Sequence, residues 1–577
     1  MPDLEILDRA SADHIDQAFR AALARASKGM SPIDLGLAYL DWISHLAISP
    51  GKRMLLVQSF VNKLSRLGLY SISSLFDSNA KAPAGKLERR VSGEAWKKWP
   101  FKVFAQAHQV SKDWWHEACA DVDGVRDHHE VQVQAVAGAI LDMMSPANYL
   151  FTNPDVLQLT RKEKGGNLVR GVRNMVKDQL RDALNTGVEE NDTFTVGENV
   201  GATPGKVIFR NELLELIQYE PVTKTVAAEP VLICTPWIGK YYILDLSPHN
   251  SMVKWLTGRG KTVFVTSWKN AGAEDRDIGL NDYLDQGLMQ AFDAVGAVCP
   301  QRKINAVGYC LGGSLLCIAA AAMARDGEDR LQSISLFAAQ ADFSEAGEIT
   351  RFISPSQLSF LEKLMWKQGF LGSENMGGAF SSLRASDLVY AATVDRYLMG
   401  NDARPNDLMA WNADGTRLPY RMHHEYLSRL YMENQLACNK YLVDGRPVSM
   451  ADLKAPVFVL GTETDHVAPW RSVYKIHDLT RTEVTFVLTS GGHNAGVVSG
   501  PEHPRRHYRS HTHRAGDNYL DPGSWFDGND PVQGSWWPQW DRWLDTQSSE
   551  QVKPPAMGAP NEAYKVVGDA PGNYVFG

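Results

Sequence analysis

The spacing of apolar residues divides this chain into two parts. Up to about residue 200, apolar side chains recur every three or four positions, as on one face of an α-helix, and residues 101–119 are a clear instance. From about residue 205 onward, short apolar and β-branched runs alternate with helix-like stretches. The strand-like runs are 231–234, 262–265, 304–307, 334–337, 457–460 and 484–488. This alternation predicts a parallel sheet flanked by helices.

The fourth and fifth strand-like runs are separated by roughly 120 residues, far more than the usual loop of ~4–6 residues. The interval is rich in aromatic and methionine residues between positions 352 and 380. We therefore expect a cap insertion over about residues 343–440, which covers an active site or binds an apolar acyl group. The alternative is a purely structural subdomain. The expected domains are a mainly helical one over residues 1–200 and an α/β one over residues 201–577.

A candidate nucleophile follows the third strand-like run. The sequence Gly308-Tyr309-Cys310-Leu311-Gly312 has the Gly-x-nucleophile-x-Gly pattern between a predicted strand and a predicted helix. This pattern is the nucleophile elbow of the α/β-hydrolase fold, in which glycines let the strand run directly into the helix. A buried cysteine in an ordinary glycine-rich turn remains the alternative, because five-residue patterns recur by chance.

Cysteine at the nucleophile position favours thioester and acyl-transfer chemistry over plain ester hydrolysis. The sulfur is expected at a helix N-terminus, where the helix dipole and free N–H groups favour a thiolate. The backbone N–H of Leu311 is the expected first donor of an oxyanion hole.

The remaining two members of a catalytic triad are expected after later strands. In α/β hydrolases the chain order is nucleophile, acid, base. Asp465 follows the fifth strand-like run, and His493 follows the sixth on a glycine-rich loop. The sequence therefore predicts a Cys310–His493–Asp465 triad.

Other residues compete for these roles. Asp342 follows the strand after the elbow, where some hydrolases place their acid. Glu463 is expected to be solvated, and His466 to make a structural hydrogen bond. Ser314, Cys317 and most of the tryptophans near the C-terminus are expected to be packing residues.

Composition excludes several functional classes. With 59 basic and 67 acidic residues the net charge is −8, so no global basic field favours nucleic acid. No segment approaches the ~18–20 apolar residues of a membrane span, and the N-terminus does not read as a signal peptide. The six scattered cysteines indicate a reducing cytosol and no zinc site. No cofactor is expected. His503, His507 and His511 are spaced like helix ligands, but nearby arginines favour a solvated loop over a metal site.

Several longer segments resemble the poly(3-hydroxyalkanoate) synthases. The segments that carry the resemblance are 145–149 with 152–154, 240–246, 308–313, 406–408 with 411–412, 465–470, 492–493 with 495–496, and 534–538. The resemblance is to the single-component type and covers most of the chain. One departure is Glu88-Arg89-Arg90-Val91, where the family usually has Asp-x-Arg-Phe, so the resemblance does not imply the contacts of this segment.

This resemblance implies polymerisation of (R)-3-hydroxyacyl-CoA with release of CoA, the acyl group being carried on Cys310. His493 would be the base, Asp465 its partner, and an N–H of the loop at Ile238 the second oxyanion donor. It also implies a cytoplasmic homodimer associated with polyester granules and with the growing polyester chain. The preferred acyl chain length, the state of the cap and the dimer interface stay open.

Overall fold

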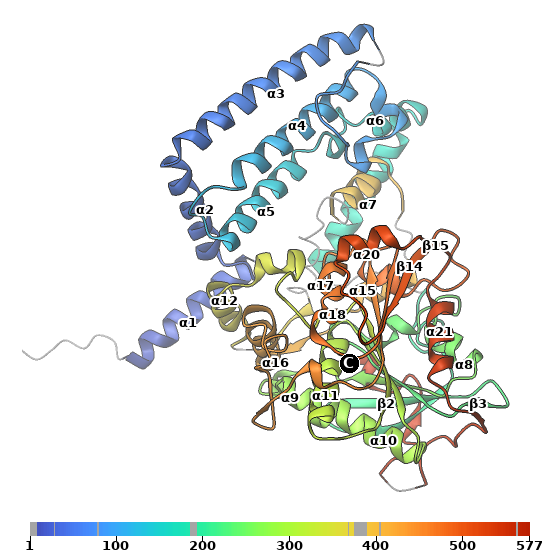
Figure 1. The fold of residues 1–577 in the computed structure, drawn as a ribbon. Coiled ribbons are helices and arrows are strands. Elements are labelled where there is room, and N and C mark those ends of the chain that lie inside the picture. The colour runs from blue at the N-terminus through green and yellow to red at the C-terminus, as the bar shows by residue number, and fades with distance from the viewer. Residues whose placement is uncertain are drawn as a thin grey trace, which may run out of the picture.

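The computed structural model describes residues 9–27, 29–77, 80–184, 193–366, 368–373, 389–402, 406–560 and 563–577. Its N-terminal part is helical and its C-terminal part is built on one large sheet (Figure 1). The N-terminal helices are α1 Arg9–Ala26, α2 Pro32–Ala47, α3 Pro50–Phe76, α4 Phe101–Cys119, α5 Asp127–Met143, α6 Pro154–Lys162 and α7 Gly166–Leu184. None of the described helices has the length and apolar character that a membrane crossing requires.

Helices α2 to α5 form a layer to one side of the sheet (Figure 1). Their small core contains Ala38 and Trp42 of α2, Cys119 of α4 and Val133 of α5. The indole N–H of Trp42 donates to the carbonyl oxygen of Ala118 at 3.0 Å, which ties α2 to the end of α4. The amphipathic spacing of residues 101–119 is therefore used to pack α4 within this layer.

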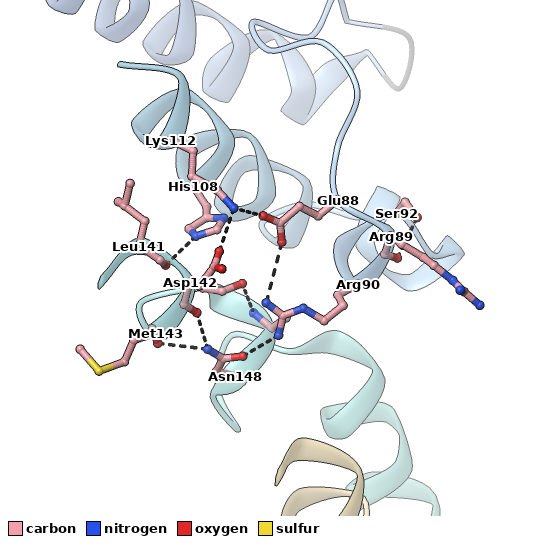
Figure 2. A network of polar contacts seen from close by, with 12 residues as sticks. Glu88, Arg89, Arg90, Ser92, His108, Lys112, Leu141, Asp142, Met143 and Asn148 are labelled. Atoms are coloured by element: carbon pink, nitrogen blue, oxygen red, sulfur yellow. Dashed lines mark hydrogen bonds and ion pairs between the residues drawn. The ribbon is translucent and has the colours of Figure 1, made fainter. Parts of the chain in front are cut away.

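Glu88 and Arg90, in the segment that departs from the family pattern, are held by ion pairs and hydrogen bonds (Figure 2). The Lys112 ammonium lies between the carboxylates of Glu88 and Asp142, 2.8 Å from the latter. The Arg90 guanidinium donates to Asn148 Oδ1 at 2.8 Å, and the Asn148 amide donates to the carbonyl oxygen of Asp142 at 2.7 Å. Glu88 and Arg90 thus connect the chain before α4 to the end of α5.

Over the described residues, the large sheet has eleven strands in the order β15-β14-β13-β12-β7-β6-β4-β5-β2-β1-β17. Its two edge strands are β15 Val532–Gln533 and β17 Gly568–Asp569. Its central strands, from β13 to β5, are parallel, and antiparallel pairs flank them on both sides. The parallel strands are β4 Val231–Cys234, β5 Val263–Trp268, β6 Ile304–Tyr309, β7 Leu331–Phe337, β12 Val457–Thr462 and β13 Val484–Thr489. These six match the six predicted runs, because strands buried on both faces are continuously apolar.

Two apolar cores lie on opposite faces of the sheet. One contains α10 Gln290–Val298 and α11 Leu311–Arg325. The other contains α8 Met252–Gly258 and α21 Trp537–Thr546, and it buries Trp536, Trp537 and Trp540. The prediction that these tryptophans are packing residues is thereby confirmed.

Two parts of the sheet differ from the sequence-based expectation. The strand-like runs of the sequence do not include β1 Gly205–Arg210 or β2 Leu214–Tyr219. The prediction of a solvated loop for the histidine-rich segment was wrong over β14 His507–His513, which pairs antiparallel with β13. Its polar side chains hide its strand character, and His507 and His511 lie about 13 Å apart along it, too far to share a metal ion.

The insertion between β7 and β12 packs against the N-terminal helices as well as the sheet. Its described elements include α12 Pro355–Met365, η9 Val394–Leu398, α15 Asp407–Ala413, α16 Tyr420–Glu425 and η10 Tyr426–Met432. Ser354 Oγ donates to Asp34 Oδ1 at 2.9 Å, and the N–H of Ser31 donates to Gln357 Oε1 at 2.8 Å. Positions 367, 374–388 and 403–405 of the predicted cap lie outside the described residues.

A second contact joins α7 to η9 and the turn that follows it. The Asn167 amide donates to the carbonyl oxygen of Leu398 at 2.7 Å, and the Asp178 carboxylate accepts two hydrogen bonds from Arg396 at 2.5 and 2.6 Å. Figure 1 places α7 between the helical layer and the sheet. The N-terminal helices therefore contact the insertion at two places along its length.

The close approach of α7 and η9 depends on Gly171. A Cβ atom at this position would overlap the carbonyl oxygen of Tyr397. We expect Gly171→Ala to lower stability by about 1–3 kcal/mol, because backbone cannot yield as a flexible side chain does. A Cβ atom added at Gly138 of α5 would have nothing within 4 Å, so Gly138→Ala should instead stabilise by up to about 1 kcal/mol. Thermal unfolding of both variants checks this, and a shift in the same direction would contradict it.

Candidate active site

Cys310 stands between β6 and α11 in a strained backbone conformation. Its φ is 52° and its ψ is −124°, in a region that residues with a side chain rarely adopt. Its backbone N–H donates to the carbonyl oxygen of Phe337 at 2.9 Å, which fixes the turn to the end of β7. The sulfur is half-buried at the N-terminus of α11. The predicted strand–turn–helix arrangement is present.

The glycines of the elbow are required by close packing. A Cβ at Gly308 would lie 2.9 Å from the carbonyl oxygen of Gly312, within the turn itself. A Cβ at Gly312 would lie 2.7 Å from the carbonyl oxygen of Thr235, just after β4. The first turn of α11 therefore lies against the loop that follows β4.

That loop carries the second predicted oxyanion donor. Ile238 is half-buried, and Thr416 of the insertion holds the loop on both sides of it. The Thr416 hydroxyl donates to the carbonyl oxygen of Trp237 at 2.9 Å and accepts from the N–H of Gly239 at 2.8 Å. Leu311 is the first residue of α11, where helix N–H groups have no partner within the helix. Leu311 therefore lies within the elbow, and Ile238 belongs to the loop against which the first turn of α11 packs.

Asp465 and His493 are hydrogen-bonded to each other. His493 begins α19 His493–Val497, and its Nδ1 lies 2.8 Å from Asp465 Oδ2. The Asp465 carboxylate is fully buried and also accepts hydrogen bonds from the N–H groups of Val467 and Ala468, both at 2.9 Å, and from Thr462 Oγ1 at 3.0 Å. Because a carboxylate only accepts hydrogen bonds, the proton between the pair belongs to His493 Nδ1.

Burial and charge act in opposite directions on these two groups. Burial disfavours the imidazolium, but the Asp465 carboxylate and the Cys310 sulfur outweigh it and hold the pKa of His493 well above its usual range. Burial likewise disfavours the Asp465 carboxylate, but His493 and the two backbone N–H groups hold its pKa below the usual range. The Cys310 sulfur is thus close enough to act electrostatically on the imidazole, and the imidazole is hydrogen-bonded to Asp465.

The competing residues are engaged elsewhere. Asp342 accepts hydrogen bonds from Ser344 at 2.8 Å and Asn434 at 3.2 Å. Glu463 is not fully solvated as expected, since it pairs with His507 at 3.0 Å. Ser314 donates to the carbonyl oxygen of Gln340 at 2.7 Å. Cys317 is buried in α11, as expected for a packing residue. Over the described residues, no group of three acidic, histidine or cysteine side chains could hold a metal ion.

Two further pairs of residues belong to this site and were missed from the sequence. The Tyr309 ring stacks on His493 with a centroid distance of 5.8 Å, and its hydroxyl donates to Asn494 Oδ1 at 2.5 Å. Tyr309 and Asn494 adjoin the predicted nucleophile and base, so adjacency could have indicated them.

The second missed pair comes from the insertion. Tyr426 and Tyr431 of η10 have their hydroxyls 3.4 Å apart. Burial raises the pKa of both phenols. Tyr426 belongs to the apolar cluster against which Tyr431 and Cys310 both pack, so the pair lies in the surroundings of the sulfur. No sequence signal marks them, because the position of the insertion over the elbow is a tertiary property.

The arrangement can perform nucleophilic acyl transfer. It brings together a thiol at a helix N-terminus, an imidazole that can take the thiol proton, and a buried carboxylate that stabilises the resulting imidazolium. The N-terminus of α11, where Leu311 begins the helix, offers backbone N–H groups that have no partner within the helix.

Comparison with known proteins assigns the chain to a family. Residues 87–256 match the family model described as poly-beta-hydroxybutyrate polymerase (PhaC) N-terminus, and residues 10–52 match a second N-terminal model of the same polymerase. Residues 229–499 match the alpha/beta hydrolase fold, which confirms the predicted fold class.

Three relatives match over most of their length. The poly(3-hydroxyalkanoate) polymerase subunit PhaC of Rhizobium meliloti is 34% identical, over 98% of this chain and 93% of the relative. That of Rhizobium etli is 36% identical over 86% of this chain and 77% of the relative. That of Cupriavidus necator is 33% identical over 94% of this chain and 91% of the relative. The elbow and the fold agree with these relatives, and the chain belongs to the family of the poly(3-hydroxyalkanoate) polymerases.

Proposed function

We propose that this protein polymerises (R)-3-hydroxyacyl-CoA thioesters into a poly(3-hydroxyalkanoate) and releases CoA. The observation that carries the proposal is the hydrogen-bonded pair of Asp465 and His493 with Cys310 beside it at a strained elbow, in a chain related over nearly its whole length to such polymerases. The polymer comes from the names of those relatives, and the CoA thioester substrate from the family resemblance.

The first half of the reaction loads the enzyme. His493 Nε2 accepts the thiol proton of Cys310, and the sulfur attacks the thioester carbonyl. The N–H groups of Leu311 and Ile238 stabilise the oxyanion, each such donor being worth about 3–4 kcal/mol. The C–S bond to CoA then breaks, and the imidazolium returns the proton to the departing CoA sulfur. Exchange of one thioester for another is close to isoenergetic, which suits a cysteine.

The second half extends the polymer. The hydroxyl of another hydroxyacyl unit, or of the growing chain, loses its proton to His493 and attacks the acyl carbonyl on Cys310. The new ester bond forms as the C–S bond breaks, and the Cys310 sulfur recovers the proton from His493. Water competes with this hydroxyl, so exclusion of water by the insertion around Tyr426 and Tyr431 supports polymerisation over hydrolysis.

The test uses purified protein with (R)-3-hydroxybutyryl-CoA. We expect CoA release, followed with a thiol reagent, together with an insoluble polyester of 3-hydroxybutyrate. Soluble 3-hydroxy acid in place of polymer would mean a thioesterase or depolymerase. If no CoA were released, a non-catalytic granule protein would be the remaining interpretation. The rates with short and medium acyl chains then define the substrate preference.

The working assembly is also part of the proposal. We expect a homodimer that acts at the surface of cytoplasmic polyester granules and needs no cofactor, CoA being part of the substrate. Light scattering of the purified protein, and its distribution between granules and supernatant, test these two points.

A further inference from the structure

Arg506 holds the loop that carries His493. Its Nη2 donates to the carbonyl oxygen of Ala495 at 2.9 Å and its Nε donates to Ser499 Oγ at 2.8 Å. Its Nη1 donates to the carbonyl oxygen of Ser490 at 3.2 Å. Ser490 precedes His493 and the other two acceptors follow it. One rigid guanidinium therefore ties together both sides of the turn on which the histidine sits.

The arginine itself is anchored to the sheet. Arg506 immediately precedes β14, and its carbonyl oxygen accepts from the N–H of Gly534 at 2.7 Å. The N–H of Ser490 donates to the carbonyl oxygen of His507 at 2.9 Å, so the base of the loop is joined to the same strand. The contacts of Arg506 therefore link residues 490–499, the loop that carries His493, to β14.

The loop is shaped around the guanidinium. Gly491 has a φ of +113°, and a Cβ atom there would lie 2.6 Å from Arg506 Nη1. In the part of the chain that the structure describes, Arg506 has no carboxylate partner, and burial lowers the pKa of its guanidinium. A half-buried cation held only by carbonyl and hydroxyl oxygens costs stability, which argues for a purpose beyond surface charge.

Other contacts support the end of the loop but do not span it. The indole N–H of Trp536 donates to the carbonyl oxygen of Gly496 at 3.1 Å, and that of Trp537 to the carbonyl oxygen of Val497 at 2.9 Å. Both acceptors follow His493. The neighbouring Arg505 is exposed, so the two adjacent arginines differ in what they contact.

We propose that Arg506 is a positioning residue, which fixes the His493 imidazole against the Cys310 sulfur by clamping residues 490–499. The proposal rests on the acyl-cysteine chemistry given above, since it assigns Arg506 a role in the pairing of these two groups. Misplacement of a catalytic group by about 1 Å can cost about 100-fold in rate.

The test measures this pairing without requiring polymerisation. Alkylation by iodoacetamide is followed at Cys310 and at exposed Cys438 by peptide mass spectrometry between pH 6 and 9, which makes Cys438 an internal reference. The other cysteines stay unreactive, because burial raises the pKa of their thiols, to about 11 for Cys119 and about 12 for Cys299 and Cys317. The variants are Arg506→Ala and Arg506→Lys, with Arg505→Ala as the matched control.

In Arg506→Ala we expect alkylation of Cys310 at pH 6 to fall by about 10- to 100-fold, with Cys438 unchanged. kcat for CoA release should fall by a similar factor while KM stays near the wild-type value. Arg506→Lys should recover part of both, because a lysine keeps the charge but cannot donate to three acceptors in a plane. Arg505→Ala should behave as the wild type.

Unchanged Cys310 alkylation and unchanged kcat in folded Arg506→Ala protein would overturn the proposal. If Arg506→Ala does not fold, Arg506→Lys and Ser499→Ala give the same readout, the latter removing one acceptor. If the wild-type protein releases no CoA while its Cys310 alkylation still depends on Arg506, the proposed function fails and the positioning role stands.

Discussion

Replacement of Cys310 by alanine is expected to reduce CoA release from (R)-3-hydroxybutyryl-CoA by at least about 10³-fold. The sulfur is the atom on which the acyl group would be carried, and removing a nucleophile leaves only binding and oxyanion stabilisation. Alanine lacks the thiol but can follow the same backbone, at the energetic cost that the φ of 52° already imposes on cysteine. The measurement is the initial rate of CoA release, together with the yield of polymer.

Two further variants sharpen this result. Cys438→Ala removes an exposed thiol outside the site and should leave the rate at the wild-type level. Cys310→Ser keeps a nucleophile in the same place, but a hydroxyl is harder to deprotonate and its acyl ester is less reactive than a thioester, so we expect a rate far below that of the wild type. CoA release by Cys310→Ala within about tenfold of the wild type would exclude Cys310 as the acyl carrier.

The parts of the fold that the sequence predicts are those where a local pattern coincides with burial. The six parallel strands are buried on both faces, so each is a continuous apolar run. The elbow is marked by Gly308 and Gly312 because a Cβ at either would meet backbone atoms. Chain order then locates Asp465 and His493, since both follow parallel strands whose ends meet at one edge of the sheet.

The parts that the sequence does not predict depend on tertiary contacts. Strand β14 is polar and histidine-rich, and its pairing with the neighbouring strands β13 and β15, not its own sequence, makes it a strand. The sequence around Arg506 is typical of an exposed basic segment, but residues 490–499 fold against its guanidinium. Tyr426 and Tyr431 lie more than a hundred residues after Cys310, in an insertion whose position no local pattern specifies.

The contacts of the N-terminal helices with the insertion belong to the same class. Asp178 of α7 binds Arg396 of the insertion, and Asp34 of α2 binds Ser354. Both contacts join residues that are far apart in the chain, and both involve the insertion that also carries Tyr426 and Tyr431. The helical part is therefore connected to the surroundings of Cys310 through the insertion.

Asp465→Asn is expected to lower kcat by about 10³–10⁴-fold while KM changes little. One Asp465 oxygen accepts from the N–H groups of Val467 and Ala468, and the other accepts from His493 Nδ1. An asparagine has a single acceptor oxygen, which the two N–H groups would retain, so its NH₂ group would face His493. Nδ1 would then have to accept, and the proton would move to Nε2, where the imidazole could no longer take a proton from Cys310.

Asp342→Asn is the matched control, because Asp342 was the competing acid in the sequence. Its partners Ser344 and Asn434 lie outside the group of Cys310, His493 and Asp465, so this variant should retain most of the activity. A loss in Asp342→Asn as large as that in Asp465→Asn would contradict the assignment of Asp465 as the acid.

The same pair gives the stability of the protein a defined pH dependence. The pKa of Asp465 is lowered in the folded state, so its contribution is present above the ordinary carboxyl pKa of about 3.9 and is lost as the pH falls through the native value. The pKa of His493 is raised, so its contribution is present below about 6.5 and is lost as the pH rises through the native value. The difference in unfolding free energy between wild type and Asp465→Asn, measured in urea, should therefore be largest between about pH 4 and 6.5. A difference that grows steadily above pH 7 would mean that His493 does not gain its charge from Asp465.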